Sequence, residues 1–437
     1  MASTYLNRTL AANNEKKLTI SVWVKINKVQ EQMIVNSYYS GTYWGSLYFG
    51  SDGTLRFDDY RTSYLLKLRS TDKYNDIGSW YHIVANFDCS IGSPTAKLYV
   101  NGSEVTYLSQ TIYSQNATTS WNTDYDFQVG KGTDLGGQNF DGVMSDLYFI
   151  QGYTYDASTF GEFDSTSGEW TPLPSPTINY SGTGGNSCHL KFEDSTNLDL
   201  DSGDNSVSLT TTGTPTQTLD CPSNNFSVLN NDTYHFTNQW QANTNGGTTA
   251  NGGSGSAWKT ILPTLGDSSG KYYFEAKLIS SGSNCIIGAV DIDNQKQNSS
   301  SSWYIGQDST GQGYQNNGTA SNGGASYGTS YVNNDIIGVA MDLDNSKIYF
   351  SKNGTWQESG DPTSGASGTG ALSLTANTTY TFALSSYAGT VWNCNFGNGY
   401  FATTAVTSAG TSASTPGTFE YDVPTGYQPL TTRGLNV

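Results

Sequence analysis

The stretch YHIVANFDCSIGSPTAKLYVNG occupies residues 81–102, and DIIGVAMDLDNSKIYFSKNG occupies residues 335–354. Each reads as an apolar strand, a polar turn, an alternating strand and then Asn-Gly, a dipeptide typical of tight hairpin turns. That order is expected for the central hairpin of a β-sandwich, and it occurs twice in surroundings that differ. We therefore predict an all-β fold of two tandem antiparallel β-sandwiches, a plan that favours recognition over chemistry.

The composition agrees with a β-rich chain of two or three domains. The 437 residues include 49 glycines and 30 tyrosines, and 13% of all residues are aromatic. The many rings can build a core, because each aromatic side chain buries a large area. The net charge of −17 argues against nucleic acid as a partner, because phosphate binding needs clustered Lys and Arg. No apolar run approaches about 18 residues, so we expect no membrane insertion.

The cysteines and the first residues indicate a compartment. Five cysteines are scattered without a metal-binding or redox spacing, so we interpret them as small buried apolar residues in a reducing cytosol. The opening MASTYLNRTLAANNEKKLTI has no apolar core of a secretory signal. We expect no signal peptide and synthesis in a cytoplasm.

Apolar alternation predicts the strands of both halves. Residues 18–26 alternate strictly and are interpreted as a half-buried strand. Other strands of the first half are predicted at 45–49, 54–57, 80–87, 96–100, 127–129 and 143–150. Strands of the second half are predicted at 258–261, 271–279, 285–292, 303–305, 336–343, 347–351, 380–385 and 391–396. The only helical candidate is residues 156–163, DASTFGEF, with Asp156 as its N-cap.

The domain boundaries follow a shift in composition. We assign residues 1–163 to the first sandwich and 224–437 to the second, with a connector rich in Pro, Ser, Thr and Gly at 164–223. Within the connector, CHLKFE at 188–193 alternates and predicts one ordered strand. Long polar loops, which are often functional, are predicted at 241–257, 307–330 and 359–370.

Several segments carry a family resemblance. The first half resembles the laminin-G-like, concanavalin-A-like jelly-roll family in LTISVWVKI (18–26), SWYHIVANFD (79–88), KLYVNGSEV (97–105) and FDGVMSDLYFIQG (140–152). The second half resembles SPRY domains in GKYYFEAKL (270–278), IIGAVDID (286–293) and IIGVAMDLDNSKIYFSKNG (336–354). The closing FEYDVPTGYQPLTTRGLN (419–436) looks like the last SPRY strand. Residues 189–205 resemble a displaced opening laminin-G strand, so we hypothesise that 190–193 close the first sandwich, as in a permuted jelly roll.

The pairing of these modules after MASTYLNRTLAANNEKKLTISVWVK resembles virion structural proteins of tailed bacteriophages, especially marine and cyanobacterial ones. The resemblance implies a non-enzymatic virion protein: an exterior fibre, tail appendage or capsid decoration that adheres to a host-surface glycan or receptor. It also implies contacts with other virion proteins, and homo-oligomers fit that use. A purely structural virion role and a polysaccharide depolymerase are the alternatives.

Catalytic groups are sparse in the sequence. Retaining glucanases need two carboxylates about 5 Å apart on one face. Glu162 and Asp164 lie in a loop or helix end, and Glu420 and Asp422 run directly into Val-Pro without a third acid. His82 lies in the middle of a predicted strand and is interpreted as a packed histidine. We therefore predict that the chain is not an enzyme.

Aromatic residues give the stronger signal. NSYYSGTYWGSLYFG at 36–50 places several rings around a Ser-Gly turn, and rings on adaptable polar loops suit sugar binding. The predicted ligand-binding residues of the first half are Tyr38, Tyr39, Tyr43 and Trp44. In the second half they are Tyr314, Tyr327 and Trp356, which flank the loops where SPRY relatives bind partners. Packing in a core or between subunits is the alternative interpretation.

Calcium is the one cofactor that the resemblance implies. Laminin-G-like domains often bind it on the rim through Asp, Asn and carbonyl oxygens, which are suitable hard ligands. The candidates in this chain are Asp52, Asp134, Asp141 and Asp146. A role as ordinary turn residues is the alternative for Asp52 and Asp141.

Overall fold

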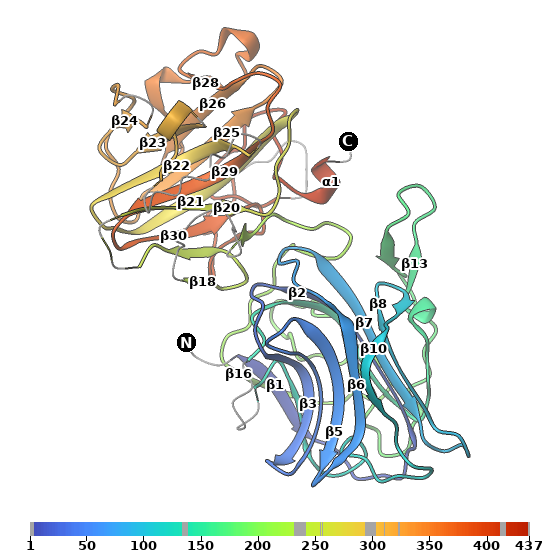
Figure 1. Cartoon of the computed structure of the whole chain (residues 1–437). Helices are drawn as coiled ribbons and strands as arrows, with labels where there is room; N and C mark the ends of the chain where they lie inside the picture. The colour runs from blue at the N-terminus through green and yellow to red at the C-terminus, as the bar shows by residue number, and fades with distance from the viewer. Residues whose placement is uncertain are drawn as a thin grey trace. The chain divides into compact units, whose positions relative to one another are not determined.

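The computed structural model describes residues 4–132, 139–230, 242–253, 255, 257–292, 303–309, 311–321, 324–410 and 417–435. The chain divides into two compact units, Met1–Gln217 and Thr218–Val437. Each unit is built mainly from two antiparallel sheets (Figure 1). The predicted all-β class with two tandem antiparallel sandwiches is thereby confirmed.

The first unit packs an eight-stranded sheet against a six-stranded sheet. The larger sheet has the order β10-β6-β5-β4-β3-β11-β1-β16, with bounds Tyr107–Thr111, Tyr64–Lys73, Thr54–Arg61, Tyr43–Phe49, Gln32–Ser40, Asp126–Val129, Tyr5–Thr9 and Thr210–Thr212. The smaller sheet has the order β15-β12-β2-β7-β8-β9, with bounds Cys188–Leu190, Gly142–Gln151, Lys17–Ile26, Trp80–Asp88, Thr95–Val100 and Ser103–Glu104. A separate hairpin pairs β13 (Gly161–Phe163) with β14 (Trp170–Pro172).

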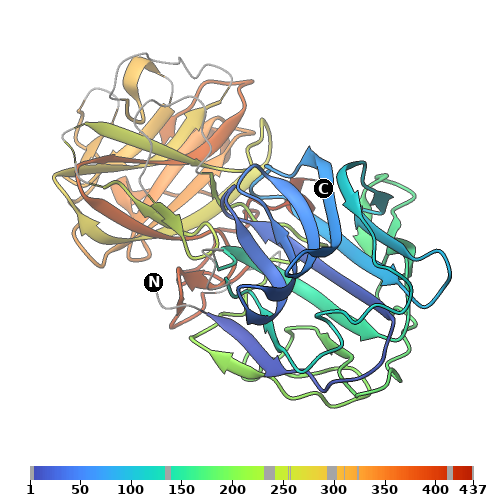
Figure 2. The same ribbon diagram turned by 60° about the horizontal axis from the view of Figure 1, so that its bottom comes forward.

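The second unit repeats the two-layer plan, which Figure 2 shows for its yellow to red strands. Its six-stranded sheet has the order β17-β20-β29-β22-β23-β24, with bounds Leu229–Asn230, Trp258–Pro263, Tyr380–Tyr387, Asn284–Asp291, Gly311–Gln315 and Thr319–Ala320. Its larger sheet has the order β18-β19-β30-β21-β25-β26-β27, with β28 beside β26. The bounds are Ala242–Thr244, Thr249–Asn251, Thr390–Asn395, Lys271–Ser281, Ile336–Asp342, Lys347–Lys352, Thr355–Trp356 and, for β28, Leu372–Ser373. A short ribbon pairs β31 (Tyr400–Phe401) with β32 (Thr404–Ala405).

Helix is nearly absent from the described residues. There is one short α-helix, α1 (Thr432–Leu435), and there are 3-10 turns at Ala157–Thr159, Gln307–Ser309, Gln357–Ser359 and Gly365–Ser367. Across the described part of the chain, no helix is long and apolar enough to cross a membrane.

The strand predicted as half-buried is buried on both faces. The apolar residues of β2 face the core between the two sheets. Thr19, Ser21 and Trp23 on its other face are also buried. Residues 153–180 supply the cover, because their aromatic rings pack on Tyr148 and its neighbours in a second apolar cluster. Alternation correctly placed the two faces but could not reveal the cover.

A buried chain of polar contacts fastens the β13–β14 hairpin to this covered face. Trp170 Nε1 donates to His82 Nδ1 at 3.0 Å, and His82 Nε2 lies 2.9 Å from Ser21 Oγ. Because an indole nitrogen can only donate, Nδ1 must accept and the imidazole proton sits on Nε2. Trp23 stacks on the imidazole with ring centroids 4.6 Å apart. Burial lowers the pKa of His82 to about 3. The side chain is 1% exposed, which confirms the interpretation of a packed histidine.

Much of the predicted connector folds into the first unit. β15 pairs antiparallel with β12, with Leu190 opposite Leu147 and Cys188 opposite Phe149. It therefore forms an edge of the smaller sheet, and its strand ends at Leu190 rather than continuing to residue 193. Further along, β16 adds an edge to the larger sheet beside β1.

The predicted helix at 156–163 is wrong. The structure has one 3-10 turn there, followed at once by β13. Asp156 does not cap the turn, because its carboxylate accepts a hydrogen bond from Tyr99 Oη at 2.9 Å instead.

The predicted strand at 303–305 is also wrong. Trp303 and Ile305 are buried against the outer face of the six-stranded sheet in the second unit. Their backbone is bonded to side chains rather than to a strand. Thr260 Oγ1 donates to Trp303 O at 3.0 Å, and Ile305 N donates to Ser385 Oγ at 3.0 Å.

The closing segment of the second unit is a cover rather than the last strand. Among the residues described, 417–428 form no strand, and Gln428 makes only a single parallel bridge with Tyr272. Phe419, Val423 and Tyr427 pack on the outer face of the larger sheet. Prolines at 424 and 429 lack the N–H that a strand ladder needs, which favours this irregular path.

A buried carboxylate holds this cover in place. Glu275 accepts hydrogen bonds from Glu420 N at 2.8 Å, Tyr421 N at 2.9 Å and Tyr273 Oη at 3.0 Å. Burial raises the pKa of Glu275 to about 7, although these hydrogen bonds act in the opposite direction.

Candidate functional site

Two hairpin turns lie side by side at one end of the larger sheet in the first unit. The β3–β4 turn meets the β5–β6 turn where Thr62 N donates to Thr42 O at 2.9 Å. In the strands beside these turns, Tyr43 lies opposite Arg61 and Trp44 lies opposite Tyr60. Because neighbouring residues of a strand point to opposite faces, Tyr43 and Arg61 lie on one face of the sheet and Trp44 and Tyr60 lie on the other. We name the rings around this end of the sheet the aromatic rim, and it has two clusters: Tyr39, Tyr43 and Tyr125, and Trp44, Tyr60 and Tyr64.

The first cluster of the rim surrounds Tyr39. Its ring is 68% exposed and stacks on Tyr125 with centroids 5.2 Å apart and an interplanar angle of 20°. Tyr43 meets Tyr39 edge-on at 6.4 Å. The Arg61 guanidinium lies 5.8 Å from the Tyr43 ring centroid and 5.5 Å from that of Tyr125, and it donates to Tyr125 Oη at 2.8 Å. The cation holds these rings in an ordered arrangement.

The second cluster surrounds Trp44. Trp44 stacks on Tyr60 with centroids 5.7 Å apart, and Tyr64 meets both rings edge-on, at 6.4 Å and 5.1 Å. Tyr64 is 37% exposed. Lys67 Nζ and the Arg69 guanidinium carbon lie 5.2 Å and 5.6 Å from its ring centroid. Exposed rings held rigid by neighbours form a platform on which a sugar ring can stack.

A row of polar side chains crosses the same sheet next to the rim. We name it the polar row, and it consists, in strand order, of Gln128, Asn36, Ser46 and Asp58. All four side chains are buried. One oxygen of each, the Gln128 Oε1, Asn36 Oδ1, Ser46 Oγ and Asp58 Oδ1, has no hydrogen-bond partner among the described residues. Buried oxygens are normally paired, so these four suit ordered water or the hydroxyl groups of a ligand.

The other atoms of the polar row are engaged. Asn36 Nδ2 donates to Lys131 O at 2.8 Å. Asp58 Oδ2 accepts from Tyr48 Oη at 2.9 Å and from Arg69 Nη2 at 3.0 Å. Burial raises the pKa of Asp58, and the charge of Arg69 opposes that rise.

The structure brings together the residues predicted for the first half. Tyr39, Tyr43 and Trp44 belong to the rim, and Tyr38 lies opposite Trp44 in the neighbouring strand. Sequence reasoning missed their partners on β5 and β6 and at residue 125. The signal was present in YRTSYLLKLR at 60–69, where rings and cations alternate with leucines, but only the strand register connects it to β4.

The residues predicted for the second half do not form a surface site. Tyr314 is 0% exposed and Tyr327 is 4% exposed, and both belong to the core of that unit. Their hydroxyls donate to Thr329 O and Gly370 O. Trp356 is partly buried and packs on the cluster beneath the closing segment. Packing explains the two tyrosines, so their proposed role as contact residues is corrected.

The aspartates predicted as calcium ligands do not converge. Although burial raises its pKa, hydrogen bonds from Thr54 and the charge of Arg56 lower the pKa of Asp52 to about 2. Asp141 lies 3.6 Å from Lys28 Nζ, and Asp146 lies 3.1 Å from His189 Nε2. Asp134 lies outside the described residues. Within the described ranges, no group of three or more His, Cys, Asp or Glu residues could hold a metal ion.

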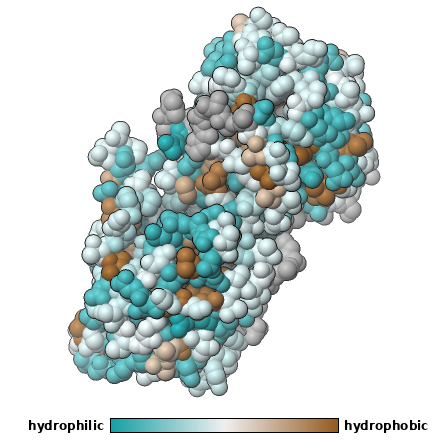
Figure 3. Space-filling model, turned by 180° about the vertical axis from the view of Figure 1, so that it is seen from behind, coloured by the Kyte–Doolittle hydropathy of each residue, from teal (hydrophilic) through white to brown (hydrophobic). Residues whose placement is uncertain are grey.

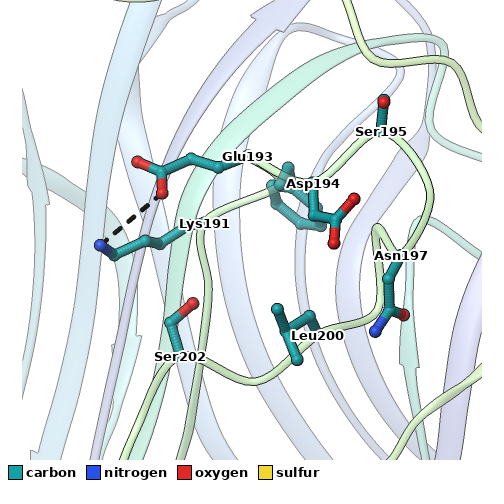
Figure 4. A pocket seen from close by; sticks show the side chains of 8 residues that line it. Lys191, Glu193, Asp194, Ser195, Asn197, Leu200 and Ser202 are labelled. Atoms are coloured by element: carbon teal, nitrogen blue, oxygen red, sulfur yellow. Dashed lines mark ion pairs between the residues drawn. The ribbon is translucent and has the colours of Figure 1, made fainter.

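An open pocket of about 400 Å³ lies in the first unit just after β15 (Figure 4). It is lined by residues 191–195, 197, 200 and 202. Two of its charged side chains, Lys191 and Asp194, interact with residues close to them in the sequence. Lys191 Nζ lies 3.8 Å from Glu193, and Asp194 accepts from Thr196 N at 2.9 Å and from Thr196 Oγ1 at 2.7 Å. The lining has one ring, that of Phe192, and so has no stacked pair of rings like those of the rim.

Among the residues that the structure describes, the rim shows no carboxylate pair at the spacing that glycoside hydrolysis requires. Asp58 belongs to the polar row, and Asp126 lies on the same face three strands away, a separation of about 14 Å. Both oxygens of Asp126 already accept hydrogen bonds, from Asn7 and Gln128. Paired glycosidase carboxyl groups lie within about 10 Å of each other. The arrangement is suited to binding.

The surface around the units is largely polar. On the face shown in Figure 3, hydrophobic residues stand in small groups between hydrophilic ones. Such scattered apolar residues are normal for a folded surface, so no broad apolar face on that side competes with the rim as a binding site.

Comparisons with known proteins agree with the two-unit fold. Residues 2–153 match the family model described as the concanavalin A-like lectin/glucanases superfamily, and residues 271–385 match the SPRY domain model. No curated protein matches the chain.

Three solved structures are similar to parts of the chain. The SPRY domain of human HERC1 is 15% identical and covers 34% of this chain and 87% of its own, with a TM-score of 0.26. The heptameric SAP-like pentraxin of Limulus polyphemus is 21% identical and covers 34% and 70%, with a TM-score of 0.26. Domain 4 of AbnA, a GH43 extracellular arabinanase of Geobacillus stearothermophilus in complex with arabinotriose, is 18% identical and covers 33% and 66%, with a TM-score of 0.26. In chain order, a segment similar to the concanavalin A-like lectin/glucanases superfamily is followed by a segment similar to the SPRY domain.

Proposed function

We propose that this chain is a non-enzymatic adhesion protein that binds carbohydrate through the aromatic rim of its first unit. One observation carries the proposal: stacked, partly exposed rings lie beside a row of polar oxygens without partners. Sugar C–H faces stack on aromatic rings. Sugar hydroxyls can be connected to the buried oxygens of the polar row through bridging water. The lectin-like and SPRY domains support a binding function.

The setting that we propose is the exterior of a tailed-bacteriophage particle, as a fibre, tail appendage or capsid decoration. This part of the proposal rests on the sequence resemblance described above. In that setting the protein is made in the host cytoplasm, joins other virion proteins and touches a host-surface glycan or receptor. Many copies would strengthen a weak site, because avidity adds roughly 10²–10⁴-fold without new contacts.

A structural role is the second candidate. The exposed ring of Tyr39 would then pack against a neighbouring virion subunit, since aromatic rings are enriched in the centres of protein interfaces. A polysaccharide depolymerase is a weaker third candidate, because Asp126, the carboxylate on the same face as Asp58, lies three strands away at about 14 Å.

Replacing Tyr43 and Trp44 together by Ala should weaken glycan binding by at least about tenfold, because each ring contributes about 1 kcal/mol of stacking. The measurement is binding of the purified protein to a glycan array and to host cells, with near-ultraviolet circular dichroism to check folding. Phe163→Ala is the matched control, since it removes a ring that is 58% exposed in the same unit but outside the rim.

The outcomes separate the three candidates. Unchanged binding by the double variant would reject the rim as the site. If the unaltered protein binds no glycan but is tightly incorporated into particles, the structural role is favoured. Release of reducing ends from a polysaccharide would favour the depolymerase.

A further inference from the structure

We propose that the saccharide held by the aromatic rim is acidic, and that Lys67 and Arg61 bind its anionic groups. The inference rests on the proposed function and names the ligand class of the same site. It is carried by the distribution of charge over β5 and β6 and by the contacts that each cation does and does not make.

Basic residues are concentrated on these two strands. The chain has 20 Lys and Arg against 37 Asp and Glu. Residues 54–73 alone carry five of the cations, namely Arg56, Arg61, Lys67, Arg69 and Lys73. The same residues carry three acids, Asp58, Asp59 and Asp72, which leaves a local excess of two positive charges (5 − 3) in a chain whose net charge is −17.

Among the described residues, the acids of this hairpin form no ion pair with Arg61 or Lys67, although the charge of Arg61 acts on the buried Asp59. Asp58 pairs with Arg69 at 3.0 Å. Both oxygens of Asp59 are occupied, by Tyr113 Oη at 2.7 Å and by Ser120 N and Oγ at 2.8 Å and 2.7 Å. Burial raises the pKa of both carboxyls, and the charges of Arg69 and Arg61 oppose that rise.

Arg61 and Lys67 are the cations left over. Arg61 donates to Thr118 O at 3.2 Å and to Tyr125 Oη at 2.8 Å, both of them neutral acceptors. Its Nε is buried without a partner among the described residues. Among the residues that the structure describes, no carboxylate lies within ion-pair distance of Arg61 or Lys67. By contrast, Arg56 pairs with Asp52 at 3.1 Å.

Each unpaired cation lies over a ring of the rim. Lys67 lies over Tyr64 in one cluster, and Arg61 lies over Tyr43 and Tyr125 in the other. A sugar stacked on either cluster would place a carboxylate or sulfate next to the cation of that cluster. Charge-assisted hydrogen bonds to such groups are about twice as strong as neutral ones. The hydroxyls of a sugar on the Trp44 cluster lie on the same face as the polar row.

Single-stranded nucleic acid also combines rings with anions, but the structure favours a saccharide. Nucleic-acid grooves need many cations along a backbone, and the rim offers two unpaired ones in a strongly acidic chain. We therefore make an oligonucleotide an outcome of the test.

The experiment compares acidic polysaccharides with their own carboxyl-reduced, neutral forms. The probes are polygalacturonate, alginate and hyaluronan, immobilised beside the reduced form of each, together with single-stranded oligothymidine. The full chain is measured at low and high salt. We expect at least one acidic probe to bind about tenfold more tightly than its reduced form, with the difference shrinking at high salt.

Variants assign the effect to the rim. Lys67→Gln and Arg61→Gln should each weaken binding to the acidic probe about fivefold, the loss expected for one partly exposed charge contact. Each variant should lose less binding to the neutral form than to the acidic probe. Lys73→Gln is the control, because it removes the same charge from the other end of β6, opposite Thr54, and should change binding less than about twofold.

The failures are distinguishable. Equal or tighter binding of the reduced forms would overturn this inference and leave the proposed function intact. Binding to no saccharide would overturn both. Preferential binding of oligothymidine that depends on Lys67 would also overturn the saccharide assignment.

Discussion

Acidification from pH 7 to pH 4 should destabilise the first unit by about 3 kcal/mol through His82 alone. An unfolded histidine takes up its proton near pH 6.5, whereas burial holds the pKa of folded His82 at about 3. Between those values the unfolded chain binds more protons than the folded chain. Stability from this group is therefore complete above pH 6.5 and is lost as the pH falls toward 3.

The structure explains why the imidazole resists the proton. His82 Nδ1 already accepts from the indole of Trp170, and that nitrogen cannot carry a proton while the contact lasts. Protonation would break the contact that fastens the β13–β14 hairpin. The first response to acid should therefore be release of this hairpin.

Hydrogen exchange of the full chain, followed by mass spectrometry of peptides, checks this prediction. Peptides covering β7 and the β13–β14 hairpin should lose protection between pH 6.5 and pH 4 after correction for intrinsic exchange rates. His82→Gln should remove this dependence, because Gln does not ionise. His189→Gln should retain it, since it removes a different imidazole of the same unit. Equal acid sensitivity in His82→Gln would refute the assignment.

The second unit should respond to pH in the opposite direction. We expect it to lose about 3 kcal/mol as the pH rises from 4.5 to 7, because an unfolded Glu ionises near pH 4.5 and burial raises the pKa of folded Glu275 to about 7. In that window the folded chain binds more protons than the unfolded chain. The contribution of Glu275 is thus greatest at low pH and has been lost above pH 7.

Urea unfolding of the full chain between pH 4.5 and pH 8, followed through peptides from β21 and residues 417–428, measures this effect. Glu275→Gln should flatten the pH dependence. Glu420→Gln is the matched control, because it removes the neighbouring carboxylate, whose bonds run to Thr407 rather than into the core. A pH profile that is identical in Glu275→Gln and the unaltered chain would contradict the prediction.

The central strands could be predicted from sequence because their apolar alternation is strong. β2, β7, β8, β25 and β26 lie where the pattern places them. Edge strands and polar strands gave no such signal. β10 (Tyr107–Thr111) and β23 (Gly311–Gln315) carry few core residues, so their identity depends on neighbours that are distant in the sequence.

The candidate site was only half predictable for a related reason. Sequence showed the rings around the β3–β4 turn, but Tyr60, Tyr64 and Tyr125 reach them only through strand register. In the second unit, sequence reasoning predicted exposed contact residues where the structure has buried ones. Treating 307–330 as one loop made Tyr314 look exposed, whereas it belongs to β23 and faces the core.

The cover over β2 has a consequence for how this module can be exchanged. Residues 153–180 seal the outer side of the smaller sheet, and β15 and β16 complete both layers from positions far beyond the jelly-roll pattern. A recombinant fragment ending near Phe163 would lose Trp170, Ile178 and Tyr180 from this cover, together with both edge strands. Gene shuffling or protein engineering that treats this part as a transferable cassette should therefore splice after Gln217.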